Sequence, residues 1–144
     1  MDNAPADCKA ACQRWQQSQM ARNIADRAVQ AAKILFDIAK INSDKAFWLM
    51  VAALALYISA SVNPVLAGYV FHFYILYLAA NLNYIFCLGQ MDTQRKDLTD
   101  RVRDAQNAAI AENADRWTVI TTCNADEADD CLSHPQISSA MLGQ

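Results

Sequence analysis

The feature that most constrains this chain is a run of 46 consecutive residues, from Ala46 to Met91, that contains no Asp, Glu, Lys or Arg. All 12 basic and all 15 acidic residues lie outside the run, in positions 1–45 and 92–144. One membrane crossing needs about 20 apolar residues, so a run of this length predicts two crossings. We therefore expect the central segment to lie in a bilayer, or in an equally apolar interior of an assembly.

The turn between the two crossings is expected at Asn63-Pro64, because proline lacks a backbone donor and disfavours helix at the preceding residue. This predicts a helix over about 46–62, a turn within Ser61–Leu66 and a second helix over about 65–89. A single kinked helix is the alternative, but 46 residues would make a helix about 69 Å long, more than one bilayer needs. The hairpin places both termini on the same side of the membrane.

The two flanking segments have the spacing of amphipathic helices. Apolar residues recur at intervals of four and three in the N-terminal arm (1–45) at Ile24, Ala28, Ala31, Leu35 and Ile38, and in the C-terminal arm (92–122) at Leu98, Val102, Ala105 and Ala109. We expect a helix break or bend at Asn42–Lys45, whose side chains are typical of caps, with a continuous helix as the alternative. The predicted fold is all-α: a membrane-spanning hairpin (46–91), two amphipathic arms that pair antiparallel, and an acidic, polar tail (123–144).

The arms can be paired by assuming that residues 45 and 91 lie at the same level. Facing residues then have numbers that add up to about 136, and a sum of 137 places Ala28 opposite Ala109 and Leu35 opposite Val102 at the arm interface. The same register places Arg22 opposite Asp115. Packing of each arm on neighbouring subunits is the alternative that these seams also permit.

Four of the five cysteines lie at the far ends of the arms. Cys8 and Cys12 are one helical turn apart, and Cys123 and Cys131 follow the C-terminal arm. Their spacing differs from the C-x2-C pairs of structural zinc sites, so disulfides are favoured over free thiols or a metal site. The register predicts Cys12–Cys123 and Cys8–Cys131, with the opposite cross-pairing as the competitor.

Three polar residues interrupt the second apolar helix: His72, Asn81 and Asn83. Polar groups inside a membrane suggest function by default. Without acidic partners or further ligands nearby, interhelical hydrogen bonding is favoured over a pore-lining or metal-binding role.

No sequence motif points to catalysis or to a cofactor. The chain has two histidines, no Gly-rich phosphate loop and no metal-protease or nucleophile signature, so we expect no enzyme activity, cofactor or metal. The net charge of -3 and the absence of a basic patch argue against nucleic-acid binding.

The sequence favours a small integral membrane subunit with a structural or assembly role. Its expected partners are the lipid bilayer and either copies of itself or a larger complex, such as a secretion apparatus, channel ring, filament or virion membrane. The alternative is a pore-forming or ejected channel protein that inserts its hairpin into a target membrane, and a third possibility is an accessory subunit of a respiratory or transport complex.

The side on which the arms lie is left open by two opposing indications. Lys and Arg residues flank the spans, whereas the connecting turn has no charge, which favours cytoplasmic arms. Disulfides favour an oxidising compartment instead.

Overall fold

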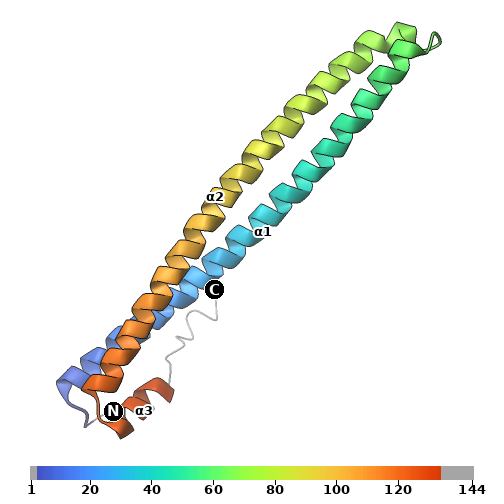
Figure 1. Ribbon diagram of the computed structural model, residues 1–144. Helices are drawn as coiled ribbons and strands as arrows, with labels where there is room; N and C mark the ends of the chain where they lie inside the picture. Colours follow the sequence, from blue (N-terminus) through green and yellow to red (C-terminus); the bar gives the residue numbers. More distant parts are fainter. Residues whose placement is uncertain (1–2, 134–144) are drawn as a thin grey trace. The chain divides into compact units, whose positions relative to one another are not determined.

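The computed structural model describes residues 3–133 and is all-α over that range, as predicted. Helix α1 (Ala6–Val62) is followed by a short 3-10 helix, η1 (Ala67–Tyr69), then α2 (Val70–Thr122) and α3 (Ala125–Ser133). The two long helices pair closely in a hairpin (Figure 1). Two compact units are distinguished along the chain: residues 31–99, and the residues up to Gln30 together with those from Asp100 onward.

The hairpin turn lies where the sequence predicted it. Helix α1 ends at Val62, and the carbonyl of Asn63 accepts a hydrogen bond from the backbone N–H of Leu66 at 3.1 Å. The Asn63 side-chain oxygen accepts a second bond, from the N–H of Val65 at 3.0 Å. Asparagine thus closes the turn locally, and Pro64 supplies a position that has no amide donor to satisfy.

The predicted break at Asn42–Lys45 is wrong, because α1 continues through it. Ser43 is buried (4% exposed) on the side of the helix that faces α2, and Ala46 (2%) follows it one turn later. Side chains that are typical of helix caps do not end a helix by themselves. Here buried contacts with α2, before and after this segment in the sequence, keep it helical. Helix α2 likewise runs unbroken through Gly89–Met91, where the apolar helix and the arm were expected to join.

In the unit formed by residues 31–99, α1 contacts α2 through a line of small side chains. Every seventh residue of α1 there is an alanine, and all five are buried: Ala32, Ala39, Ala46, Ala53 and Ala60. Alternating with them are Phe36, Ser43, Met50 and Tyr57, so the contact follows a regular three-four spacing. We call these residues the inner seam. Alanine allows two helix backbones to approach closely, which larger side chains would prevent.

Larger residues of α2 fill the space opposite these alanines. They are half-buried and, together with the small Ala80, follow a three-four spacing: Phe73, Tyr77, Tyr84, Cys87, Met91 and Gln94. The aromatic rings of Phe47 and Tyr84 lie 5.6 Å apart, and those of Tyr57 and Tyr74 lie 5.5 Å apart. The two helices therefore pack small residues against large ones.

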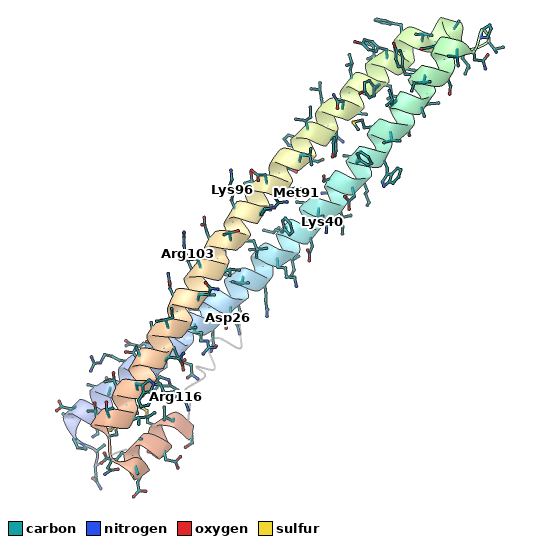
Figure 2. The ribbon with its side chains drawn as sticks, viewed as in Figure 1. Asp26, Lys40, Met91, Lys96, Arg103 and Arg116 are labelled. Carbon is teal, nitrogen blue, oxygen red and sulfur yellow. A yellow bond between two sulfur atoms is a disulfide. The ribbon has the colours of Figure 1, made fainter. Side chains whose placement is uncertain are left out.

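These contacts correct the predicted register. The numbers of residues at the same level add up to about 131 rather than 137, as for the pair Phe47–Tyr84 and for Lys40 and Met91, which lie level in Figure 2. The register is fixed by the turn, where α1 ends at Val62 and α2 begins at Val70. The predicted register was counted from the edges of the charge-free run. That count was wrong, because Lys45 and Met91 do not lie at the same level.

The four residues expected at the arm interface differ in burial. Ala28 and Ala109 are half-buried, whereas Leu35 is 49% exposed and Val102 is 38% exposed.

The small-to-large packing predicts a sharp difference between two neighbouring alanines. Ala53→Leu, at a residue 4% exposed, should lower the free energy of unfolding by about 1–3 kcal/mol, because the added atoms would push the helices apart. Ala55→Leu, on the exposed side of the same turn, should change it by less than about 0.5 kcal/mol. Denaturant titration of both variants in detergent micelles, followed by circular dichroism, measures the difference. Equal effects would contradict the assigned seam.

Candidate functional site

The ends of the arms form the hydrophobic core of the unit that combines residues up to Gln30 with those from Asp100 onward. This core contains four cysteines, a tryptophan and three small aliphatic residues: Cys8, Ala11, Cys12, Trp15, Val119, Cys123, Ala128 and Cys131. Val119 and Cys8 are fully buried. The arms are thus fixed at the end farthest in sequence from the hairpin turn.

Two disulfides cross this core, as the cysteine positions predicted, but with the competing pairing. Cys8 is bonded to Cys123 (Cα–Cα 4.9 Å) and Cys12 to Cys131 (Cα–Cα 6.1 Å), so the predicted pairs Cys12–Cys123 and Cys8–Cys131 are wrong. The bonds join residues 115 and 119 positions apart. Cross-links over such separations typically stabilise a fold by roughly 2–4 kcal/mol each, mainly by restricting the unfolded chain.

The pairing follows from the register and from helix α3. The numbers of Cys8 and Cys123 add up to 131, the same register as in the hairpin, so these residues lie level. The chain then turns at Asn124, and α3 delivers Cys131 to Cys12, which lies one turn farther into α1. Without helix α3, an extended or irregular tail would not be expected to turn back toward α1.

Helix α3 begins with a reciprocal cap that was not among the predicted features. The Asn124 side-chain oxygen accepts a hydrogen bond from the backbone N–H of Glu127 (2.9 Å), and a Glu127 carboxylate oxygen accepts one from the N–H of Asn124 (3.3 Å). An Asn followed three residues later by Glu is a recognisable helix-start signal. Ala128 and Cys131 are buried on one face of this helix, and the acidic residues lie on the others.

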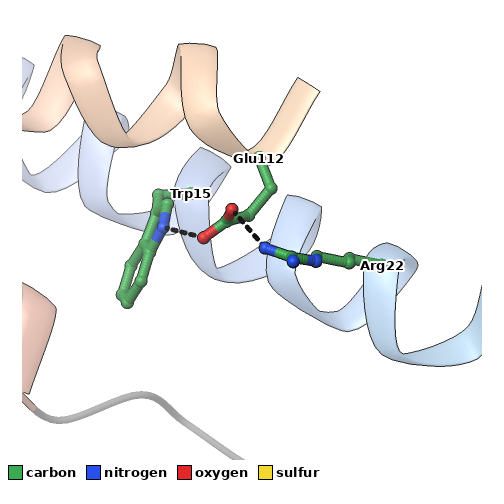
Figure 3. A network of polar contacts seen from close by, with 3 residues as sticks. All are labelled: Trp15, Arg22 and Glu112. Atoms are coloured by element: carbon green, nitrogen blue, oxygen red, sulfur yellow. Dashed lines mark hydrogen bonds and ion pairs between the residues drawn. The ribbon is translucent and has the colours of Figure 1, made fainter. Parts of the chain in front are cut away.

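A buried polar layer interrupts the contact between the arms next to the disulfides. Glu112, only 7% exposed, accepts a hydrogen bond from the Trp15 indole N–H at 3.0 Å and forms an ion pair with Arg22 at 3.0 Å (Figure 3). Ser18 donates its hydroxyl hydrogen to Asp115. Arg22 therefore pairs with Glu112 and not with Asp115, the partner given by the predicted register. A polar pair within an apolar seam favours one alignment of two helices over others.

One group of potential metal ligands is present among the described residues. The Cys8 and Cys123 sulfurs and a Glu127 carboxylate oxygen lie within 4.8 Å of one another. Because the two sulfurs are joined in a disulfide, neither offers the thiolate that a metal ion requires. The group acts as a covalent staple in this oxidised form.

The hairpin presents the opposite kind of surface, in which large apolar side chains point outward (Figure 2). Exposed residues within the charge-free run include Trp48, Leu49, Val62, Val65, Phe71, Leu82, Ile85 and Phe86. Both long helices contain a stretch that is apolar and long enough to cross a membrane, and only 17% and 6% of those stretches are buried. A core helix of a globular protein would instead be mostly buried.

The three polar residues of the second apolar helix do not converge on one site. His72 and Asn83 are exposed and Asn81 is half-buried. The His72 ring lies near Tyr69 (centroids 6.3 Å apart) and Phe71 (6.5 Å). Cys87, the one free cysteine among the described residues, is half-buried in the contact with α1.

No known family model, curated protein or solved structure matches the chain.

The disulfide pairing can be read directly by peptide mapping. Digestion without reduction should yield one peptide pair joined by Cys8–Cys123 and another joined by Cys12–Cys131, with Cys87 alkylated as a free thiol. Mass spectrometry before and after reduction identifies both pairs. Recovery of a Cys12–Cys123 peptide would contradict the register at the arm ends.

The buried polar layer should be sensitive to loss of its acceptor. Glu112→Ala removes the partner of the Trp15 N–H and should destabilise the fold by about 1–3 kcal/mol, because the buried donor is left unpaired. Glu112→Gln keeps an acceptor oxygen and should cost less. Asp100→Ala, which breaks an exposed pair with Arg103, is the matched control and should cost below about 0.5 kcal/mol in the same thermal or denaturant measurement.

Proposed function

We propose that this protein is a small integral membrane subunit with a structural or assembly role. Its hairpin anchors the chain in a bilayer, and its stapled arms make contacts outside the membrane with copies of itself or with a larger complex. The observation that carries this proposal is the direction of the apolar side chains in residues 46–91: the inner seam is already packed, and the larger residues point outward.

Water is a poor environment for that outward surface. Burying one large aliphatic or aromatic side chain is typically worth about 1.5–3 kcal/mol, and many such side chains are exposed along both helices of the hairpin. Contiguous apolar surfaces of this kind mark membrane or protein contacts. Lipid covers all sides of a two-helix hairpin at once, whereas a protein contact covers one side. The exposed apolar surface therefore supports a bilayer over a one-sided protein contact.

The arms have the properties of a rigid spacer. Two disulfides, a buried core and a polar layer hold their ends together, and their outer surfaces carry most of the charge. Because such disulfides persist in oxidising compartments, we place the arms on the non-cytoplasmic side, against the indication of the flanking Lys and Arg residues.

A pore-forming or ejected channel protein is the second candidate, and the exposed apolar surface favours it equally. The two candidates differ in when the hairpin enters a membrane. A structural subunit is found in the membrane fraction of the producing cell from synthesis onward, and the purified protein does not release dye from liposomes. Soluble protein in the producing cell together with dye release would support the pore-former.

The membrane role can be tested with two equally exposed residues of α2. Leu82, near the middle of the second apolar stretch, and Ile110, in the arm, are each 67% exposed. Leu82→Arg should weaken membrane insertion by about 3 kcal/mol, because a guanidinium at the centre of a span is unfavourable. Ile110→Arg should have no effect on insertion, because this residue lies outside the membrane.

Flotation of reconstituted vesicles on a density gradient measures both variants against the unchanged protein. The unchanged protein and Ile110→Arg should float with the lipid, and Leu82→Arg should be depleted from the floating fraction. If the unchanged protein stays at the bottom of the gradient, the proposed function is wrong.

A further inference from the structure

The tip of the hairpin, residues 62–69, is apolar although it forms a turn. It has no Asp, Glu, Lys or Arg, and Lys45, the nearest such residue in the sequence, precedes Asn63 by 18 residues, about 27 Å along a helix. Val62 and Val65 are 78% and 83% exposed, more than any other large apolar residue that the structure describes. Turns that face water usually consist of Gly, Pro, Asn, Asp and Ser, so the two valines favour an apolar environment.

The segment between α1 and η1 pairs each of its backbone donors internally. Asn63 donates its N–H to the Ser59 carbonyl at 3.0 Å, and its own carbonyl accepts the N–H of Leu66 at 3.1 Å. Its side-chain oxygen accepts the N–H of Val65 at 3.0 Å, and Pro64 has no N–H. An unpaired backbone donor is strongly unfavourable in hydrocarbon, where water supplies no acceptor. This turn keeps its donors paired when lipid tails surround it.

The polar side chains near the tip require no fixed charge. Ser61 donates its hydroxyl hydrogen to the Tyr57 carbonyl at 2.8 Å. His72 lies next to the rings of Tyr69 and Phe71, and an imidazole can cross a membrane in its neutral form. The tip therefore enters hydrocarbon without carrying an ionised group.

The two disulfides determine which part of the chain can enter a membrane first. Cys8–Cys123 and Cys12–Cys131 join the arms covalently, so the chain is a closed loop and neither arm can cross a bilayer alone. All 12 Lys and Arg and all 15 Asp and Glu residues lie outside the charge-free run. Moving charged side chains through hydrocarbon is unfavourable. The tip is the part of this loop whose entry moves none of them.

We propose that the hairpin enters a preformed bilayer tip first, from the side on which the stapled arms already lie. The tip is then a bilayer-entering surface, and its partner is the hydrocarbon of that membrane. The arms stay on the side of entry, and the tip emerges at the far surface. This inference rests on the proposed function, because it describes how the hairpin reaches the position that the proposed function gives it.

The experiment adds the purified full-length protein, with both disulfides intact, to preformed phosphatidylcholine vesicles by dilution out of detergent. Flotation followed by extraction with alkaline carbonate measures the inserted fraction, and external trypsin then reports the orientation. The charge-free run has no Lys or Arg, so it should survive as a protected fragment while both arms of every inserted molecule are cleaved. Arms that are protected inside the vesicles would overturn the inference.

Two variants at one exposed residue of the tip test whether it crosses. Val65→Lys should lower the rate of insertion into preformed vesicles about 50-fold, because a charged side chain must pass the middle of the bilayer. Val65→Met, an uncharged side chain of similar length, should insert within about twofold of the unchanged rate. Equal rates for the two variants would show that the tip does not cross.

Reconstitution by removing detergent from mixed lipid and protein separates entry from the final position. No preformed bilayer has to be crossed there, so Val65→Lys should float and resist carbonate as well as the unchanged protein does. Its exclusion from these vesicles too would place the tip inside the hydrocarbon and overturn the crossing. If the unchanged protein inserts only by this route, the inference is wrong and the membrane role stands; if it floats by neither route, the proposed function itself is wrong.

Discussion

Close approach of the two long helices depends on a small side chain at every seventh position of α1. Ala11, Ser18 and Ala25 in one unit, and the five buried alanines in the other, occupy equivalent positions of the same repeat. Because α1 contributes little volume to the contact, α2 contributes aromatic and long aliphatic residues that fill it. Shape then supports the register that the turn sets, since larger side chains at the alanine positions would push the helices apart.

The same constraint explains why so much apolar surface points outward. A helix pair built on alanine buries few atoms per residue, so the large aliphatic residues of α1 have no place in its interior. Such a pair gains limited hydrophobic stabilisation from its own contact. The two disulfides and the Trp15–Glu112–Arg22 layer add stability and alignment at the ends of the arms. At the hairpin, the surroundings must supply the remaining stabilisation.

Sequence patterns predicted the all-α hairpin, the turn at Asn63-Pro64 and the cysteines that staple the arms, because each depends on local chemistry or on a long charge-free run. The register and the disulfide pairing were wrong for one shared reason: they were counted from the edges of that run, whereas the turn fixes the level of the helices. The inner seam was missed because hydrophobic periodicity gives weight to isoleucine and leucine, although alanine is the residue that lets helices approach. The Asn124–Glu127 cap was a readable signal for α3.

The apolar line first assigned to the arm contact has a different meaning in the structure. Ile24, Ala28, Ala31, Leu35 and Ile38 also recur every three and four residues. Ile24, Ala31 and Ile38 each lie one position before a residue of the small-residue repeat, and Ala28 and Leu35 lie one position before the larger Val29 and Phe36. Helix α1 therefore carries two parallel seams on adjacent faces: one of small residues, used within the chain, and one with larger residues, half-buried or exposed. A helix that pairs once needs only one seam. Two seams at a fixed angular offset are expected of a helix with two helical neighbours, and within residues 3–133 α1 has one long neighbour, α2.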